Sequence, residues 1–468
     1  MASVSHDSAS STNLQFEDVE EALDIHINLS SPEMQIFQLK ERAIDGKYYR
    51  LDYQTAGNAY MAARAEGEYH PGYDPASTAE DGFGTYTVNE LKFYNRWVYH
   101  SLDFTGQMKT AVKSRKGGYK NLVDFRFDDT VKHMEEQVAI KLATSQLGTR
   151  GKIQSITTTA VTLYYAGTAL TTQPQLYEGG SRYIRAGMRL DAASSRTAVL
   201  RTGAADRGRQ VTAVAMDTGS STAGPVVTLN SAPTAWAADD FLFIYKERQV
   251  ADLTTGTSEY QGKCYSPLGL MDAVDDGDIS PYYGGVDRTA SGNESLKAIV
   301  FDNGSSGLRD LTHQLLNQSV ERVKQLSGGE PNIFYSPFGV QRNFVNFLTL
   351  TGAASTASDN PMRFNQPGAK QKIGFNSFDV FPLGMSGALR FMPSRLAPHH
   401  TGFLLEQGSG VFLRDGPPGF LDEDGQKIRK TKGLDAYTAD WKMTAAGFVV
   451  KAPWRNCRID DLSGSHME

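Results

Sequence analysis

Two stretches in the first quarter of the chain carry the pattern of a long β-hairpin. Lys47–Tyr53 is rich in aromatic residues, and much of Thr85–Phe104 alternates apolar with polar positions. That alternation is the period of a half-buried strand. Between them, Gly67–Gly84 is rich in Gly, Pro, Asp and Tyr, which predicts a turn-rich tip. We therefore expect an aromatic hairpin over residues 47–105, packed on another surface because it has no core of its own.

The pattern changes to a helical period after residue 120. Apolar residues recur there at spacings of four, three, four and four, at Phe127, Val131, Met134, Val138 and Leu142. These spacings place them on one stripe of an amphipathic helix. We expect a long helix over residues 121–147, with Gly148 and Gly151 at its end.

The stretch from Gly151 to Gln249 differs from its surroundings. It is rich in Thr, Ala, Ser and Gly, and turn residues separate strand signals at 160–165, 211–214, 226–229 and 241–245. Short strands at such intervals predict a compact β-domain. Because this stretch follows a helix and precedes a different pattern, we interpret it as an insertion.

The C-terminal half mixes helix and strand signals. Leu308–Leu326 has the apolar spacing of a second helix, which Ser327-Gly328-Gly329 would end. Pro331–Tyr335 predicts a strand, and a further helix follows through Phe344 and Leu348. The remainder alternates strands and turns.

Residues 1–46 are interpreted as an N-terminal arm. Scattered apolar residues, Phe16 and Phe37 among them, follow or flank an acidic cluster of Glu17, Asp18, Glu20, Glu21 and Asp24. Apolar side chains of an arm need a partner surface. A neighbouring subunit could supply that surface.

Composition narrows the possible functions. The 468 residues are 40% hydrophobic and 21% charged, enough to build a core, and the formal net charge is −6. A dedicated nucleic-acid binder usually carries a basic face, which this acidic balance does not favour. No apolar run approaches the length of a membrane span, and the N-terminus lacks the apolar region of a signal peptide. The last residues, 464–468, resemble a vector-derived scar.

The sequence contains no motif that indicates a catalytic, nucleotide-binding or metal-binding site. The two cysteines, Cys264 and Cys457, lack the spacing of a zinc site or a disulfide framework. Neither a nucleotide-binding glycine pattern nor an HExxH motif is present, and the pair His399-His400 offers too few ligands for a metal. The acidic runs at 272–278 and 422–425 are interpreted as solvated turns. We therefore assign no catalytic, cofactor-binding or metal-binding residue, and predict that the chain is not an enzyme.

The order of these elements resembles the major capsid proteins of tailed bacteriophages, which have the HK-ninety-seven-type fold. Phe93–Phe104 followed by Leu122–Leu147 is similar to the return strand of that family's extension loop and its spine helix. Pro331–Pro337, with the helix to Leu350, is similar to its axial domain. Its late strands and closing segment are matched by 372–380, 402–406 and Tyr437–Asp460. The inserted β-stretch departs from the basic family pattern.

The resemblance implies an α+β fold with a phage major capsid architecture. The expected divisions are an N-terminal arm at 1–46, an extension-loop hairpin at 47–105, a peripheral domain with spine helix at 106–150, an inserted β-domain at 151–250, an axial domain at 251–370, return strands at 371–461 and a tail at 462–468.

The same resemblance implies a structural role in a virion. Copies would form hexamers and pentamers of an icosahedral shell, assembled in the host cytoplasm around double-stranded DNA, with scaffolding, portal or decoration proteins as further partners and no membrane or cofactor. Candidate contacts between subunits are Tyr48, Tyr49, Trp97 and Tyr99 of the hairpin, with Phe16 and Phe37 of the arm.

Three alternatives stay open. The hairpin aromatics could pack only within their own subunit. The chain could instead be a tail tube or decoration protein, although tube proteins are mainly β and usually shorter. A surface hydrolase or glycan-binding protein is the third, and it is disfavoured because no signal peptide or catalytic motif is found.

Overall fold

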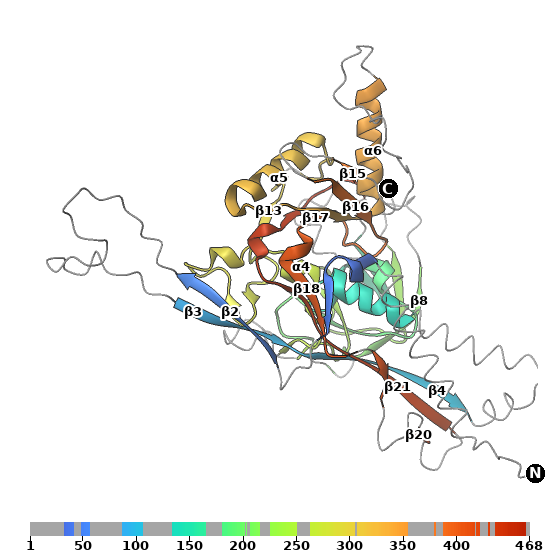
Figure 1. Ribbon diagram of the computed structural model, residues 1–468. Coiled ribbons are helices and arrows are strands. Elements are labelled where there is room, and N and C mark those ends of the chain that lie inside the picture. Colours follow the sequence, from blue (N-terminus) through green and yellow to red (C-terminus); the bar gives the residue numbers. More distant parts are fainter. Residues whose placement is uncertain are drawn as a thin grey trace, which may run out of the picture.

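A computed structural model gives the fold of the chain (Figure 1). It describes residues 32–41, 48–56, 87–105, 133–164, 180–201, 203, 206–215, 225–249, 263–304, 307–353, 379–380, 387–416, 418–421, 429–430 and 436–464. The fold is α+β, with separate sheets and few helices.

The longest strand organises the first sheet, called here the β21 sheet. Its six strands are β1 (Gln38–Glu41), β4 (Arg96–Thr105), β18 (Gly410–Arg414), β19 (Gly419–Phe420), β20 (Arg429–Lys430) and β21 (Ala436–Val450). β18, β19 and β20 pair with β21 along one edge, and β4 pairs with its other edge. β1 lies beyond β18, so β1 and β4 are at opposite edges of the sheet.

A second six-stranded sheet, the β14 sheet, has its two faces in different cores. Its strands are β13 (Ile299–Phe301), β14 (Ile333–Ser336), β15 (Asp379–Val380), β16 (Leu389–Pro393), β17 (Gly402–Leu405) and β22 (Cys457–Ile459). Phe334 and Leu404 pack with helices α5 (His313–Ser327) and α6 (Phe338–Ala353). Their neighbours Tyr335 and Phe403 enter the core shared with the β21 sheet, because successive strand residues face opposite sides.

Residues 149–244 contain a closed barrel. Its strands, in spatial order, are β10 (Phe241–Ile244), β5 (Thr149–Thr157), β6 (Ala160–Leu163), β9 (Val226–Leu229), β8 (Arg209–Val214) and β7 (Arg189–Ala193). Alternate apolar side chains fill the barrel, among them Ile153, Val161, Val227 and Leu242. Closure leaves the barrel without an open sheet edge.

A two-stranded hairpin of β2 (Tyr48–Ala56) and β3 (Thr87–Tyr94) extends the β4 ribbon beyond the body (Figure 1). The remaining elements are short: helix α4 (Leu270–Ala273), strands β11 (Tyr282–Tyr283) and β12 (Val286–Asp287), and 3-10 turns η1 (Pro32–Gln35), η3 (Gly180–Tyr183), η5 (Glu294–Leu296), η6 (Gln407–Ser409) and η7 (Pro453–Arg455).

The helix predicted over 121–147 is described from residue 133, and residues 133–143 are helical. Met134, Val138 and Leu142 are buried on one stripe, as the spacing predicted, whereas Phe127 and Val131 lie outside the described residues. Gly151 does not end this helix, because it belongs to β5.

Two other expectations need correction. The stretch over 85–104 is not one return strand, because β3 ends at Tyr94 and β4 pairs with β21 instead of with β2. The helix predicted from Leu308 begins at His313, because the side chain of Thr312 accepts a hydrogen bond from the backbone of Leu315 and caps the helix there. α6 and β14 lie where the sequence placed a helix and a strand.

Candidate assembly surface and the buried junction

The hairpin base has one buried face. Leu91 and Phe93 of β3 are almost fully buried in the core beneath the β21 sheet, and Tyr49 and Leu51 of β2 pack against the same core. Phe93 makes an edge-to-face contact with Tyr283, with ring centroids 5.1 Å apart. The base of the hairpin is thus fixed on its own chain.

The opposite face of the hairpin base carries aromatic and cationic side chains. Tyr48 pairs directly with Tyr94, and their ring centroids are 5.8 Å apart. The Arg50 guanidinium lies 5.0 Å from the Tyr48 ring centroid, and the Lys92 ammonium lies 5.6 Å from it. Glu90 forms ion pairs with both cations, at 2.7 and 3.3 Å. Cation–π contacts hold these side chains in a defined arrangement.

The outward pattern continues along β4 after a break at Asn95. Val98 packs against the core, whereas Trp97 and Tyr99 are 52% and 57% exposed. The outward positions therefore change from even numbers on β3 to odd numbers on β4, which requires the irregular residue Asn95 between the two strands. We call the surface formed by Tyr48, Arg50, Lys92, Trp97 and Tyr99 the outer face.

Among the described residues, the outer face borders a sheet edge that no second strand pairs with. In the described part of the chain, β21 is the only strand that pairs with β4. β4 is ten residues long, and its other edge is unpaired within the described part of the chain. Such an edge can accept a strand from another chain.

The residues that the sequence predicted as contacts between subunits do not all lie on one face of the structure. Trp97 and Tyr99 are exposed on β4, and Tyr48 lies on the face of the hairpin opposite to the core, whereas Tyr49 lies on the inward face of the same hairpin. Phe16 lies outside the described residues.

Phe37 is placed in the chain's own core. It is 1% exposed and makes an edge-to-face contact with Phe448, with ring centroids 5.3 Å apart. We therefore leave Phe37 out of the contacts between subunits proposed below. The described part of the arm is an intramolecular element.

A buried carboxylate fixes the start of this arm segment. Glu33 of η1 is fully buried, and it accepts hydrogen bonds from the Tyr335 hydroxyl, at 2.9 Å, and from the Ser394 hydroxyl. Both donors belong to the β14 sheet or its adjoining loop. Burial, followed by the charge of Glu33, raises the pKa of Tyr335 well above its ordinary value. The phenol therefore remains a donor to Glu33.

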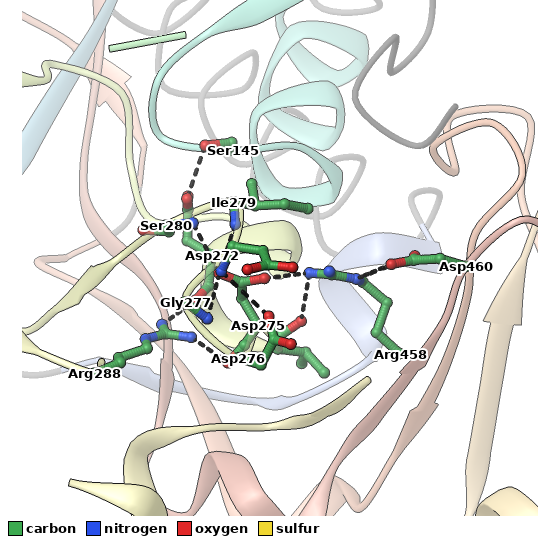
Figure 2. A network of polar contacts seen from close by, with 12 residues as sticks. Ser145, Asp272, Asp275, Asp276, Gly277, Ile279, Ser280, Arg288, Arg458 and Asp460 are labelled. Carbon is green, nitrogen blue, oxygen red and sulfur yellow. Dashed lines mark hydrogen bonds and ion pairs between the residues drawn. The ribbon is translucent and has the colours of Figure 1, made fainter. Parts of the chain in front are cut away.

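A network of buried charged side chains joins β22 of the β14 sheet to the turn after α4 (Figure 2). Asp275, after α4, lies 2.6 Å from the Arg458 guanidinium of β22, and Arg458 also contacts Asp460 at 2.9 Å. These three side chains are at most 1% exposed. The Asp275 carboxylate further accepts backbone N–H bonds from Ile279 and Ser280.

The same network reaches the end of the helix at 133–143. Asp272 accepts a hydrogen bond from the Ser145 hydroxyl at 2.7 Å and another from the backbone N–H of Gln146. Arg288 donates to the backbone carbonyls of Asp275 and Asp272. Figure 2 shows Arg288 and Arg458 approaching the aspartates from opposite sides. These contacts therefore hold the end of the helix at 133–143, the turn after α4 and strand β22 together.

The carboxyl groups of this network differ in their proton affinity. Burial raises the pKa of Asp460 to about 6, in spite of the adjoining Arg458. Burial also raises the pKa of Asp272. For Asp275 burial acts in the same direction, but the Arg458 and Arg288 guanidiniums outweigh it and lower the pKa. The three groups thus respond differently to acid.

The prediction of a solvated acidic turn at 272–278 is wrong. Asp272 and Asp275 are fully buried, although Asp278 is exposed. Sequence reasoning missed this because the counter-charge, Arg458, lies far away along the chain and meets the turn only through the sheet. A dense acidic run beside apolar Leu270 and Met271 was the only local signal.

The barrel is fixed to the body by polar contacts. The Tyr183 hydroxyl donates to the Leu396 carbonyl at 2.6 Å, and Arg185 forms an ion pair with Glu136 at 2.6 Å. Glu247 contacts the buried Lys141 of the helix. Contacts on several sides hold the barrel against the helix and the loop after β16.

Neither a metal site nor a membrane-spanning helix is found in the described residues. No group of three or more His, Cys, Asp or Glu side chains is placed to hold a metal there. No described helix combines the length and apolar character needed to cross a membrane. The two cysteines are buried free thiols, and the Nδ1 atom of His400 lies 2.8 Å from the Leu462 carbonyl.

Comparison with known proteins gives similarity at the level of structure. No family model and no curated protein matches the chain. A cyanophage A-1(L) capsid subunit is 11% identical with a TM-score of 0.46, covering 92% of this chain and 93% of that chain. An encapsulin complex from Synechococcus elongatus is 10% identical with a TM-score of 0.40, covering 93% and 89%. The capsid of Myoviridae phage XM1 is 8% identical with a TM-score of 0.39, covering 91% and 90%. Two of these three are phage capsids.

Proposed function

We propose that this chain is the structural shell subunit of an icosahedral phage head, not an enzyme. The observation that carries the proposal is the outer face together with the β4 edge. Trp97 and Tyr99 are large, exposed side chains beside a ten-residue strand edge that is unpaired among the described residues. Such a combination promotes aggregation of an isolated chain. A shell that covers this surface in every copy removes that liability.

The finer divisions are part of the same proposal. The hairpin β2–β3 is the extension loop, the helix at 133–143 belongs to the spine helix, and the β21 sheet forms the peripheral domain. The β14 sheet with α5 and α6 forms the axial domain, and the barrel is the inserted domain. β4 belongs with the peripheral sheet because it pairs with β21.

Assembly would proceed through hexamers and pentamers that enclose double-stranded DNA. Closed rings reuse one pair of complementary surfaces, so modest contacts add up over many copies. The overall negative charge, −6 per chain, would keep the shell from binding the genome tightly. Scaffolding, portal and decoration proteins are the expected partners, and the virion is the expected location.

Electron microscopy of the purified full-length chain, combined with light scattering, tests the proposal. We expect round shells, or rings of five and six subunits. Long tubes of stacked rings would favour a tail tube protein instead. A strictly monomeric chain at all salt and protein concentrations would contradict autonomous shell assembly.

A further inference from the structure

We propose that a small cavity at the break between β3 and β4 binds a single halide ion, such as chloride. The cavity is lined by the residues on either side of that break, the turn after the helix at 133–143, the segment before α4 and part of β21. It lies within one chain, so this inference goes beyond the proposed function and does not depend on it.

The size of the cavity limits the ligand to about one atom. The centre of a water-sized sphere can move through about 10 Å³ of it. That is close to the smallest space that holds one water molecule. The cavity is partly open, so a small ion can enter from solvent. Anions of several heavy atoms, such as phosphate or a carboxylate, are too large for it.

Gln146 places a buried hydrogen-bond donor at this cavity. Its Nε2 atom is buried and has no hydrogen-bond partner within the described part of the chain, and the whole residue is 3% exposed. Leaving a buried N–H group without an acceptor is costly, so nearly all such groups in folded proteins have a partner. An acceptor in the cavity would provide that partner.

Ser266 provides a second donor. Its Oγ atom lies 3.3 Å from the Lys141 ammonium and accepts a hydrogen bond from it. Because an ammonium group can only donate, the hydroxyl hydrogen of Ser266 remains to be donated to another acceptor. A water molecule in the cavity would accept from these donors but would bring two hydrogens that need acceptors of their own. A ligand that only accepts therefore matches the lining better than water does.

The charge beside the cavity favours an anion. Arg96 lines the cavity and is only 9% exposed, and its guanidinium lies 5.2 Å from the Tyr94 ring centroid. Burial lowers the pKa of Arg96, because its positive charge is poorly solvated there. A negative ion at the cavity would stabilise that charge, and the attraction is stronger in a poorly solvated site than in water.

Two carboxylates of the surrounding elements are engaged with other groups. Glu247 forms an ion pair with Lys141. Asp272 accepts hydrogen bonds from the Ser145 hydroxyl and from the backbone N–H of Gln146, and the charges of Arg196 and Arg288 act on it. These acids are therefore balanced by their own partners, and the charge of Arg96 is left for the ligand to neutralise.

A bound halide would connect the base of the hairpin to the body of the chain. Arg96 begins β4, Gln146 follows the helix at 133–143, and Ser266 precedes α4. A ligand that binds the folded chain and not the unfolded chain stabilises the folded state in proportion to the logarithm of its concentration above the dissociation constant. The folded chain should therefore be more stable in halide salts.

Denaturation of the full-length chain in urea tests this dependence. Sodium chloride or sodium bromide replaces sodium gluconate at constant ionic strength, and the gluconate anion is too large for the cavity. At a halide concentration about ten times the dissociation constant, the ratio of folded to unfolded chain should rise about tenfold. The same unfolding curve in all three salts would overturn the inference.

Gln146→Glu separates binding at the cavity from general effects of salt. Its carboxylate would stand beside Arg96 in place of the halide, so the difference between halide and gluconate should disappear. Gln137→Glu, at a partly exposed position of the same helix and outside the cavity lining, is the matched control and should keep the difference. A halide effect of equal size in all three chains would assign it to other parts of the surface and overturn the inference.

Anomalous diffraction from bromide-soaked crystals of the unaltered chain locates the ion without any substitution. We expect a bromide peak within hydrogen-bond distance of the Gln146 Nε2 atom and the Ser266 Oγ atom. Density at the cavity without an anomalous signal would identify water and overturn the inference. A bromide peak there without a halide effect in solution would mean binding at crystal concentration only, with the same consequence.

Discussion

The Arg458 guanidinium lies 2.6 Å from the Asp275 carboxylate, and neither side chain is more than 1% exposed. This ion pair joins β22 of one sheet to the turn after α4, beneath the other sheet. Removing one partner of a buried pair leaves the other charge without compensation in a poorly solvated site, which costs far more than a surface pair contributes.

Asp275→Asn should therefore destabilise the fold by about 3–5 kcal/mol. Asn keeps the shape of the side chain but leaves Arg458 without one of its two counter-charges. Equilibrium denaturation in urea measures the change. Asp278→Asn, at an exposed position of the same turn, is the matched control and should stay within about 0.5 kcal/mol of the parent chain. Equal effects at the two positions would show that the buried pair is not a major contributor.

Mild acid should strengthen this junction before stronger acid weakens it. The pKa of Asp460 is raised to about 6 in the folded chain, so the folded state binds a proton that the unfolded chain, with its ordinary pKa near 3.9, does not yet bind. Stability should rise as pH falls from about 7 towards 5. Asp275 has a lowered pKa, so its contribution is lost only below its ordinary pKa.

Denaturation midpoints at several pH values between 7 and 5 test this dependence. Asp460→Asn removes the titrating carboxyl and should flatten the slope over that range, whereas Asp278→Asn should leave it unchanged. A slope that is the same in all three chains would assign the pH dependence to other groups.

A close approach of two backbones depends on Gly447. Its φ is +97°, and a Cβ atom there would lie 2.2 Å from the Leu268 carbonyl oxygen. Gly447→Ala should destabilise the chain by about 3 kcal/mol or more, because moving either backbone would break the hydrogen bonds that join Leu268 to Ala446 and Phe448 of β21. Gly285, with φ +83° and no atom within 4 Å of such a Cβ, is the control. Gly285→Ala has only the left-handed backbone cost of about 1–2 kcal/mol.

Trp97→Ala with Tyr99→Ala should affect assembly much more than folding. Both side chains are more than half exposed in the single chain, so their loss should change its stability by less than about 1 kcal/mol. If they are anchors between subunits, the protein concentration needed for assembly should rise about tenfold or more. Light scattering measures that concentration, and Val199→Ala is the control. Unchanged assembly would favour the alternative that the aromatics serve only their own subunit.

Local periodicity predicted much of the fold. The buried stripe of Met134, Val138 and Leu142, helix α6 and strands β6, β8, β9 and β10 lie where spacing and turn residues placed them. These elements follow from short-range pattern, because one face of each is covered by the core.

Strand pairing and contacts between residues far apart in the chain could not be predicted from the sequence. β5 was missed because it begins with Thr149, Arg150 and Gly151, which do not resemble a strand, although Arg150 is fully buried. The division of 85–104 into two strands was missed because Asn95 changes the outward positions without interrupting the run of aromatic residues. The acidic turn was misread because Arg458 comes from the other end of the chain.

Which of the candidate contact residues are exposed could not be predicted from local sequence either. Trp97, Tyr99 and Tyr49 have similar sequence surroundings, yet only the first two are exposed. Which aromatic residues face outward depends on which sheet each strand joins, and pairing across the chain decides that.

The barrel is entered by β5 and left by β10, and these two strands pair with each other. The chain therefore departs from the body and returns to it at almost the same place. Such a domain could be exchanged for a foreign one with similarly close ends, without lengthening any connection in the remaining fold. Residues 149–244 thus mark a position where the protein could carry a guest domain, such as an antigen or an enzyme, in every copy of a particle.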